Sequence, residues 1–340
     1  MAVAPPLRHV VIIVKENHTF DNYFATFPGA NGFAGLPPAG DPLPDPLHDH
    51  AAWLRSLQTN GGERLGYTRQ DIAAYWAYAQ QYTLCDNYFT DVASQSEPNH
   101  LFLIAADSPV IDNSSAHRFY QPMPPFPLQS LPAALESAGR TWRNYAEPRS
   151  SYFDHIAGLA GHKWNVHSGR FDHDAAAGAL PDVAWLYAPG GLSEHPGDHT
   201  GTPAVGPGMA WTVDRVNAVA RSPQWSETVV FVTWDDWGGW FDHVTPPQNR
   251  LWPGGGHAGY HNSQFRYGNR VPCLVISPYA RQEVNHSLTS HVSIVKFCLR
   301  LFSLPPWNAP ALAAGDPSGD LWNCFDFAHA RRDPPSAVPR

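Results

Sequence analysis

The chain has 340 residues, of which 43% are hydrophobic and 15% are charged, and its formal net charge is −8. This length provides core for one large α/β domain or two smaller ones, and the negative charge argues against a nucleic-acid backbone as the main partner. No apolar run approaches the roughly 20 residues of a membrane span, and no secretory signal follows Met1. We therefore expect a cytoplasmic protein without a transmembrane segment; a secreted or periplasmic location stays open if the chain is a processed form.

Apolar runs alternate with helical patterns along the chain. Proline (34) and glycine (27) gather between these runs, which predicts long loops over a compact core. The expected strands cover residues 9–14, 141–145, 183–187, 228–234 and 271–276. The expected helices cover residues 68–82, a segment that starts near 98, and residues 131–138, 211–221 and 292–302. This alternation predicts an α/β fold with a central, mostly parallel sheet and helices on both faces. Without a repeat or a linker, we expect a single domain over residues 1–340, with a core of about 8–303 and an irregular C-terminal tail.

Two of the expected strands, 9–14 and 228–234, end in polar and acidic clusters. Each is an apolar, β-branched run, as expected for a strand buried on both faces of a parallel sheet. Glu16 and Asn17 follow the first run, and Asp235 and Asp236 follow the second. Ligands of α/β sheets bind at the carboxyl ends of strands, and adjacent carboxylates repel unless a cation lies between them. The pattern therefore favours a hard-cation site, which suits phosphate ester chemistry.

Ser96 lies just before the helix that is expected to start near Pro98. A helix N-terminus favours an anion because its free backbone N–H groups and its dipole point there. A hydroxyl at this place can attack phosphorus when a metal lowers its pKa. On this segment alone, an ordinary N-cap serine explains the residue better, and Ser94 is a competing candidate.

Histidine is abundant, with 18 residues, and most are expected to be structural or at the surface. The better candidates for chemistry lie in polar loops: His48, His50, His167, His195, His199 and His243. An imidazole can hold phosphate oxygens or protonate a leaving alkoxide. Each histidine alone is a weak signal. The four cysteines show no C-x-x-C spacing, which argues against a zinc–thiolate site.

Five blocks of sequence occur in the order found in a known family. The blocks are residues 16–24 (ENHTFDNYF), 96–100 (SEPNH), 193–197 (SEHPG), 234–244 (WDDWGGWFDHV) and 268–279 (GNRVPCLVISPY). Together they resemble the phosphoesterase family that contains bacterial and plant non-specific phospholipases C and a group of acid phosphatases, within the alkaline phosphatase-like superfamily. The resemblance spans roughly residues 8–303. It implies an alkaline phosphatase-like three-layer sandwich.

The resemblance also implies a set of site residues. One divalent metal ion would be held by Glu16, Asn17, Asp235 and Asp236, with the nucleophile Ser96 completing the shell. The resemblance also implies catalytic histidines that contact the phosphate: His195, which lies in a clear block, and His50 and His167, which match more loosely. Asn17 and His243 would bind substrate. Oxygen ligands favour calcium, magnesium or manganese, while iron and zinc stay open. The chain departs from the family pattern at Asp236, where glutamate is frequent, and at His100, where arginine is usual.

These expectations combine into a hypothesis for the activity. The resemblance implies metal-dependent hydrolysis of a phosphoric ester, of the acid phosphatase type, through a phosphoseryl intermediate on Ser96. One alternative is a phospholipase C that cleaves phospholipid head groups, because Trp237, Trp240 and Phe241 could hold a lipid or choline-like group. Another is a catalytically silent module that binds an anion or a metal. The expected partner is a small-molecule or phospholipid phosphate ester, and the oligomeric state stays open.

Overall fold

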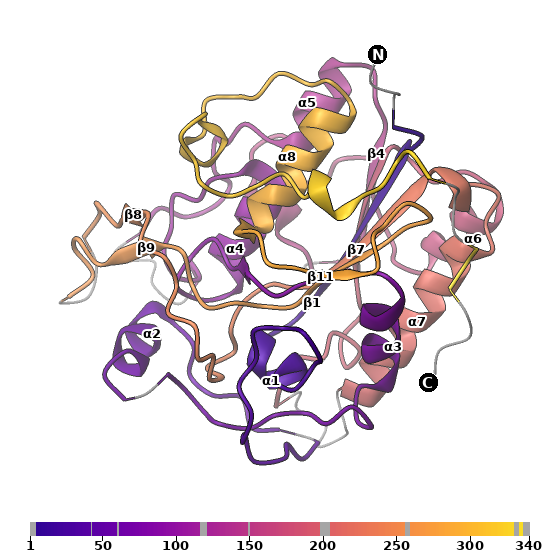
Figure 1. The fold of residues 1–340 in the computed structure, drawn as a ribbon. Coiled ribbons are helices and arrows are strands. Elements are labelled where there is room, and N and C mark those ends of the chain that lie inside the picture. The colour runs from indigo at the N-terminus through magenta and orange to yellow at the C-terminus, as the bar shows by residue number, and fades with distance from the viewer. Residues whose placement is uncertain are drawn as a thin grey trace.

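The computed structural model describes residues 5–41, 43–59, 61–115, 121–148, 150–197, 205–255, 259–329 and 333–335. An eight-stranded sheet runs through the centre, in the strand order β11-β2-β10-β7-β1-β6-β4-β5 (Figure 1). Its strands are β1 (His9–Lys15), β2 (Thr83–Cys85), β4 (Trp142–Tyr145), β5 (Asn165–Val166), β6 (Val183–Tyr187), β7 (Thr228–Trp234), β10 (Cys273–Ile276) and β11 (Glu283–Asn285). Neighbours from β7 to β5 are parallel, and β11 is parallel to β2, whereas β10 is antiparallel to both of its neighbours. The predicted mostly parallel sheet is confirmed.

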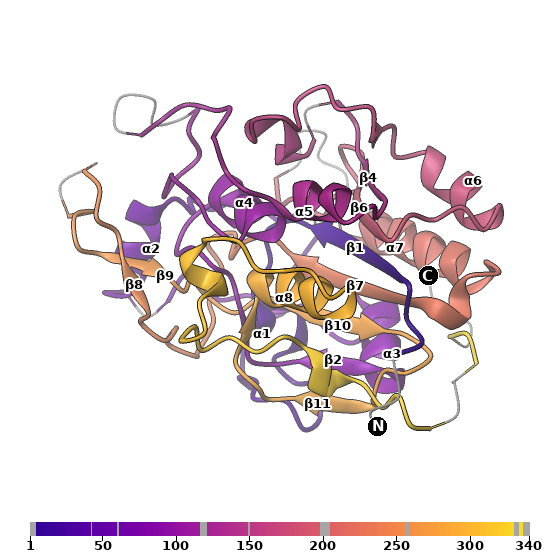
Figure 2. The ribbon, with the colours of Figure 1, turned by 90° about the horizontal axis from the view of Figure 1, so that it is seen from above.

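Helices cover both faces of the sheet, as predicted (Figure 1, Figure 2). One group packs together on one face: α4 (Ser96–Ala105), α5 (Leu131–Ser137) and α8 (His291–Leu301). The other group packs on the opposite face: α3 (Ala73–Gln81), α6 (Arg170–Ala176) and α7 (Val205–Ala220). The short helices α1 (Phe20–Phe24) and α2 (His50–Ser56) lie in loops. Short 3₁₀ turns are η1 (Tyr152–His155), η2 (Trp225–Glu227), η3 (Pro310–Leu312) and η4 (Trp322–Cys324).

The remaining strands form two small sheets of two strands each. One pairs β3 (Tyr88–Phe89) with β12 (Thr289–Ser290), and the other pairs β8 (Arg250–Leu251) with β9 (Gln264–Arg266). Helix α3 begins at Ala73, later than residue 68, where the sequence predicts its start. The Thr68 hydroxyl and N–H both donate to Asp71 Oδ2 at 2.7 Å, so this pair closes a turn of its own before the helix begins.

The central strands are buried because their side chains are apolar on both faces. All seven residues of β7 are buried, as are six of the seven in β1. Since β7, β1, β6, β4 and β5 run in the same direction, their carboxyl ends meet at one edge of the sheet. Among the helices of the described residues, none combines the length and the apolar character that crossing a membrane requires. The single-domain boundaries stay a prediction.

Candidate active site

The carboxyl ends of β1 and β7 bring two polar segments together. The strands are adjacent and parallel, with Lys15 opposite Trp234. The backbone N–H of Asp235 donates to the carbonyl oxygen of Lys15 at 2.9 Å, which extends the pairing past the strand end. The N–H of Asn17 then donates to Asp235 Oδ1 at 3.2 Å. The register of the two strands therefore places Glu16 and Asn17 beside the aspartates.

A glycine permits the close approach of the two turns. Gly238 has a φ of +59°, and a Cβ atom there would lie 2.3 Å from the carbonyl oxygen of Asn17. Its N–H donates to Asp236 Oδ1 at 2.7 Å. Asn17 has a φ of +66°, a conformation in which asparagine is enriched among residues with a side chain. Only a residue without a side chain fits at position 238, so the packing of the two turns depends on it.

Helix α4 brings a hydroxyl and an imidazole to the aspartates. Ser96 is the first residue of α4, and its Oγ donates to Asp236 Oδ2 at 3.0 Å. His100 lies one turn later on the same helix face, and its Nε2 is 3.2 Å from Asp235 Oδ2. Three segments far apart in sequence thus meet at one point: the ends of β1 and β7 and the N-terminus of α4.

The three carboxylates carry charge that the chain does not fully neutralise. Burial alone would raise the pKa of Asp235, but the hydrogen bond and charge of His100 lower it to about 2. Burial and the Asp235 carboxylate raise the pKa of Asp236 well above its ordinary range, and they raise the pKa of Glu16 as well. In the described part of the chain, the ion-pair partners of these carboxylates are histidines, with no Lys or Arg among them. A cation from outside the chain would relieve this repulsion.

The side-chain oxygen of Asn17 is a further possible metal ligand, because it is a buried acceptor without a hydrogen-bond partner. His48 Nδ1 lies 2.7 Å from the carbonyl oxygen of Pro46, so this nitrogen carries the hydrogen and Nε2 is the acceptor. Asn17 Nδ2 lies 3.3 Å from His48 Nε2, which places the amide nitrogen on the His48 side. Asn17 Oδ1 is buried and has no hydrogen-bond partner. A buried carbonyl oxygen without a partner is costly unless it has a ligand.

These donors fit a hard divalent cation. The carboxylates of Glu16, Asp235 and Asp236, the amide oxygen of Asn17 and the hydroxyl of Ser96 are all oxygen ligands. Calcium, magnesium and manganese prefer oxygen ligands, and the negative charge of three carboxylates matches a divalent ion. By the chemistry of their oxygen atoms, these residues fit a metal site. The convergence of Glu16, Asp235 and Asp236 on one ion stays a prediction, since among the described residues the carboxylate and imidazole atoms that lie within 4.8 Å of one another are those of Asp21, Asp242 and His243.

Two histidines flank this acidic cluster. His195 Nδ1 lies 2.7 Å from the carbonyl oxygen of Pro196, and its Nε2 is 3.9 Å from Glu16 Oε2. Burial alone would lower the pKa of His195, but the Glu16 carboxylate raises it above the ordinary value. The rings of His48 and His195 have centroids 6.3 Å apart, and His48 Nε2 lies 4.0 Å from Asp236 Oδ2. Both imidazoles therefore direct Nε2 toward the carboxylates.

Other predicted histidines lie elsewhere. His50 is the first residue of α2, and its ring nitrogens lie 2.7 Å from the carbonyl oxygen of Ala93 and 2.7 Å from Ser263 Oγ. His167 follows β5 and pairs with Glu147 at 2.8 Å. Among the residues that the structure describes, no contact brings either histidine to Ser96, so their catalytic roles stay predictions. His199 lies outside the described residues.

His243 belongs to a second carboxylate cluster. His243 Nδ1 lies 2.6 Å from Asp21 Oδ2. The carboxylates of Asp21 and Asp242 together with His243 lie close enough to hold a metal ion. However, Arg270 donates to Asp242 at 2.9 Å and to Asp21 at 3.2 Å. Its guanidinium already supplies the positive charge, so we interpret this cluster as a structural ion-pair network. A substrate contact by His243 stays a prediction that its surroundings do not support.

From the sequence, His48 was one of six candidate histidines without a specific role, and His100 was only a departure from the family pattern. The available signal for His100 was its i, i+4 spacing from Ser96 on a predicted helix. His48 gave no signal that separates it from His50, because both lie in one polar loop.

A buried ion pair, Lys15 with Glu194, lies next to the candidate site. Lys15 Nζ lies 3.2 Å from Glu194 Oε1, and both side chains are fully buried. Tyr23 and Trp234 also donate to Glu194, at 2.8 Å and 3.1 Å. Burial raises the pKa of Glu194 and lowers the pKa of Lys15, so each charge depends on the other. Lys15, Trp234 and Glu194 directly precede Glu16, Asp235 and His195 in the sequence, so one network anchors three segments of the site.

Comparison with known proteins identifies the family. Residues 7–42 and 49–305 match the model of the Phosphoesterase family. The chain belongs to the phosphoesterase family. Its curated relatives include a non-hemolytic phospholipase C of Pseudomonas aeruginosa, with 27% identity over 98% of this chain and 59% of that protein. Phospholipase C A of Mycobacterium tuberculosis is 28% identical over 95% of this chain and 78% of that protein. Non-specific phospholipase C6 of Arabidopsis thaliana is 23% identical over 88% of this chain and 68% of that protein.

The resemblance inferred from the five sequence blocks is therefore confirmed, and membership supports the prediction of an enzyme that acts on phosphoric esters. The chain spans 59% of the length of the Pseudomonas relative.

Among solved structures, it is similar to murine ectonucleotide pyrophosphatase/phosphodiesterase 5, with a TM-score of 0.49 and 8% identity over 94% of this chain and 100% of that chain. A Vibrio parahaemolyticus protein of the alkaline phosphatase superfamily gives a TM-score of 0.44 and 11% identity, over 94% of this chain and 71% of that chain. With TM-scores below 0.5, we base the fold assignment on the strand order itself.

Proposed function

We propose that the protein is a metal-dependent hydrolase of phosphoric esters that acts through a phosphoseryl intermediate on Ser96. The observation that carries the proposal is the position of the Ser96 hydroxyl, 3.0 Å from Asp236 at the N-terminus of α4 and beside an oxygen-lined cluster. Membership of the phosphoesterase family supports the class of reaction. A divalent ion held by Glu16, Asn17, Asp235, Asp236 and Ser96 would lower the pKa of the serine hydroxyl and offset the charge of the phosphate group.

The chain's own groups define the covalent steps. Ser96 Oγ loses its proton and attacks phosphorus, and the bond between phosphorus and the leaving alcohol oxygen breaks. The leaving oxygen takes up a proton, and the phosphate group stays bonded to Ser96. A water molecule then attacks the same phosphorus, which releases phosphate and returns the hydroxyl to Ser96. The dipole of α4 favours an anion at this place in both steps.

His48 and His195 are suited to the phosphate oxygens and the leaving group. Each has an Nδ1 fixed against a backbone carbonyl oxygen, at 2.7 Å in both cases. Each Nε2 therefore faces the cluster, where it donates a hydrogen bond when the ring is protonated. Either ring is a candidate for the general acid that protonates the leaving oxygen. His195, which the sequence predicted to be catalytic, is kept as a candidate in the proposal, and His48 joins it.

The ester class has two candidates. The sequence predicted an acid phosphatase type of activity, on monoesters. The names of the relatives, phospholipases C, favour cleavage of a phospholipid as the second candidate. The aromatic residues once expected to hold a lipid do not support it, because Trp237, Trp240 and Phe241 are 2%, 0% and 6% exposed. A panel of p-nitrophenyl phosphate, p-nitrophenylphosphocholine and phosphatidylcholine, assayed with and without a chelator, separates the two candidates.

Substitution of the nucleophile tests the mechanism. In Ser96→Ala we expect kcat to fall by at least about 10³-fold, because no other hydroxyl takes its place. Ser94→Ala is the matched control: Ser94 is the competing candidate, but its hydroxyl donates to Asp112 rather than to the acidic cluster. Asp112 retains its bonds from His50 N–H and Tyr260, so Ser94→Ala should keep both fold and activity. Near-normal turnover in Ser96→Ala would show that the nucleophile is wrongly assigned.

A catalytically silent binding module is the rival from another class. It predicts that the metal binds while none of the three esters is hydrolysed. Measuring bound metal by atomic emission alongside the release of p-nitrophenol therefore decides between enzyme and silent module. Trapping phosphoserine at position 96 by acid quench and mass spectrometry tests the covalent intermediate directly.

A further inference from the structure

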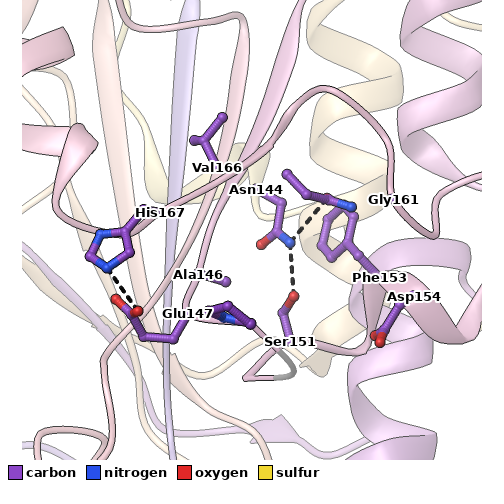
Figure 3. Close-up of a pocket in the computed structure, with 11 residues that line it drawn as sticks. Asn144, Ala146, Glu147, Ser151, Phe153, Asp154, Gly161, Val166 and His167 are labelled. Atoms are coloured by element: carbon purple, nitrogen blue, oxygen red, sulfur yellow. Dashed lines mark hydrogen bonds and ion pairs between the residues drawn. The ribbon is translucent and has the colours of Figure 1, made fainter.

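A cavity of about 370 Å³ lies at the carboxyl ends of β4 and β5, on the same edge of the sheet as the candidate active site (Figure 3). The residues that line it include Asn144, Glu147, Ser151, Phe153, Gly161 and His167. In the strand order, β4 lies two strands from β1, which is about 10 Å along the sheet. Tyr152 lies between the two places, since its neighbours Ser151 and Phe153 line the cavity while its own ring has its centroid 4.7 Å from that of His100.

Asn144 lines this cavity, and its side-chain oxygen is buried without a hydrogen-bond partner. Asn165 Nδ2 donates to the carbonyl oxygen of Leu159 at 2.8 Å, which leaves Asn165 Oδ1 on the Asn144 side. Asn144 Nδ2 donates to that oxygen at 3.2 Å and to Ser151 Oγ at 2.8 Å. The amide orientation is thereby fixed, and Oδ1 points away from these partners (Figure 3). Asn144 is 2% exposed, and its Oδ1 has no hydrogen-bond partner.

Ser151 supplies a complementary donor. Its Oγ accepts the hydrogen bond from Asn144, and among the described residues no acceptor takes its hydroxyl hydrogen. An acceptor at Asn144 and a donor at Ser151 therefore lie side by side. A single hydroxyl group of a ligand satisfies both, because it donates and accepts at once. An ammonium group satisfies only the acceptor.

The charges of the residues that line the cavity disfavour an anion. Two carboxylates line the cavity, Glu147 and Asp154, and no Lys or Arg lies among its described lining residues. The N–H of Gly169 donates to His167 Nδ1 at 3.1 Å, so His167 Nε2 carries the hydrogen and donates to Glu147 at 2.8 Å. Ser168 Oγ also donates to Glu147, at 2.6 Å. Glu147 is therefore held in place as an acidic part of the cavity lining. This negative charge disfavours phosphate, whereas hydroxyl groups can still form hydrogen bonds with the lining residues.

We propose that this cavity binds a polyol, a neutral group with several hydroxyls such as an inositol or a sugar. Its size lies within the range of small-molecule pockets, and the adjacent Asn144 acceptor and Ser151 donor match one hydroxyl of the ligand. The polyol is either a free ligand or the alcohol part of the phosphoric ester. If the polyol is the alcohol part of the ester, the inference rests on the proposed function; if it is a free ligand, it does not.

Binding of myo-inositol tests the proposal, by isothermal titration with the whole protein. Loss of one neutral hydrogen bond in Ser151→Ala should weaken the affinity about fivefold. Gly161→Asn places a side chain at the cavity, where a Cβ atom meets nothing within 4 Å and φ is +63°. Gly158→Asn is its matched control, since φ is also positive there, the space is also open, and Gly158 does not line the cavity. We expect weaker binding in Ser151→Ala and Gly161→Asn and unchanged binding in Gly158→Asn.

Tetramethylammonium serves as the second probe. If it binds and myo-inositol does not, or if myo-inositol binds equally to all four proteins, the proposal is overturned. No binding of myo-inositol would mean that the cavity holds solvent only, which also overturns it. These titrations can be repeated in Ser96→Ala, so their outcome does not depend on whether the proposed catalytic mechanism holds.

Kinetics distinguish the two sources of the polyol. If the polyol is part of the ester, Ser151→Ala raises KM for glycerophosphoinositol about fivefold and leaves KM for p-nitrophenyl phosphate unchanged. If the polyol is a free ligand, both KM values stay unchanged while the affinity for myo-inositol falls.

Discussion

The same two segments of the chain build two carboxylate clusters with different charge balance. Residues 16–17 and 235–236 form the candidate metal site, in which the ion-pair partners of the carboxylates are histidines. A few residues further along the same segments, Asp21 and Asp242 form the second cluster, in which both carboxylates are bonded to Arg270. Both clusters are buried beside the end of the central sheet.

The difference shows that proximity of carboxylates does not by itself indicate a metal site. By geometry alone, Asp21, Asp242 and His243 could hold an ion. Arg270 supplies a fixed positive charge there and also donates to the backbone oxygens of Asn31 and Asp86, at 2.8 Å and 2.7 Å. Within the described part of the chain, the Asp235 and Asp236 cluster pairs with no Lys or Arg, and it has the unpaired Asn17 oxygen instead. The positive charge of Arg270, rather than the number of carboxylates, distinguishes the structural cluster from the candidate metal site.

The largest expected effect comes from removal of the in-chain cation. Arg270→Met should lower the free energy of unfolding by about 3–5 kcal/mol, because two buried carboxylates lose their counter-charge. Urea denaturation at neutral pH measures this change. Arg300→Met is the control, since Arg300 pairs with Asp320 at the surface and its side chain is 51% exposed; we expect a change below about 1 kcal/mol. Equal losses in the two variants would contradict the structural role of Arg270.

The buried pair behind the site should couple stability to catalysis. Glu194→Gln leaves Lys15 buried without a counter-charge, and we expect a loss of about 3 kcal/mol in the free energy of unfolding. Because Glu194 precedes His195, kcat should also fall by about tenfold, with KM for p-nitrophenyl phosphate nearly unchanged. The double variant Lys15→Met/Glu194→Gln should recover part of the stability but not of kcat. Full recovery of kcat would argue against a positioning role.

Metal removal should affect only one of the two clusters. With the divalent ion at about 100 times its dissociation constant, a chelator should lower the free energy of unfolding by about 2.7 kcal/mol. Thermal unfolding with and without chelator measures this shift independently of activity. Asp236→Asn should abolish the shift, whereas Asp242→Asn should retain it despite its own lower stability. If Asp242→Asn abolished the shift and Asp236→Asn kept it, the metal would lie in the second cluster.

The smallest expected effect concerns Glu97, a buried carboxylate next to Ser96 that has partners within the chain. His155 Nδ1 lies 2.8 Å from Glu97 Oε1, and Ser114 also donates to Glu97. Burial alone would lower the pKa of His155, but Glu97 raises it above 6.5. A raised histidine pKa stabilises the fold fully below about pH 6.5, and this stabilisation is lost as the pH rises through the folded-state pKa.

We therefore expect the stability difference between the natural protein and His155→Gln to shrink by less than about 1 kcal/mol as the pH rises from 5.5 to 8.5. Urea denaturation at several pH values gives this difference. A difference that grows with pH would contradict the assigned direction of the shift.

Much of the fold could be predicted because the central strands carry a strong local signal. The apolar runs at residues 9–14 and 228–234 were assigned as buried strands, and the structure places them side by side at the centre of the sheet. Strand β10 was recognised as a strand, but its antiparallel direction was not foreseen. Direction depends on how the loop before it returns across the sheet, and no local pattern encodes that path.

Part of the candidate site could likewise be predicted from the sequence, and part of it could not. Glu16, Asn17, Asp235 and Asp236 could be found because each directly follows a strand, and strand ends meet at one edge of a parallel sheet. The choice between Ser94 and Ser96 depends on which hydroxyl faces the aspartates, and only packing of α4 decides it. The two histidines at 48 and 50 are equally polar in sequence, yet their rings contact different partners in the structure.

The sequence by itself determined the family, the class of fold and the oxygen-rich chemistry of two strand ends, because these follow from local patterns and ordered motifs. Only the tertiary structure decided which buried carboxylates are neutralised within the chain. Arg270 lies 28 residues from Asp242 and 249 residues from Asp21, and ion pairing depends on distance in space rather than on distance along the chain.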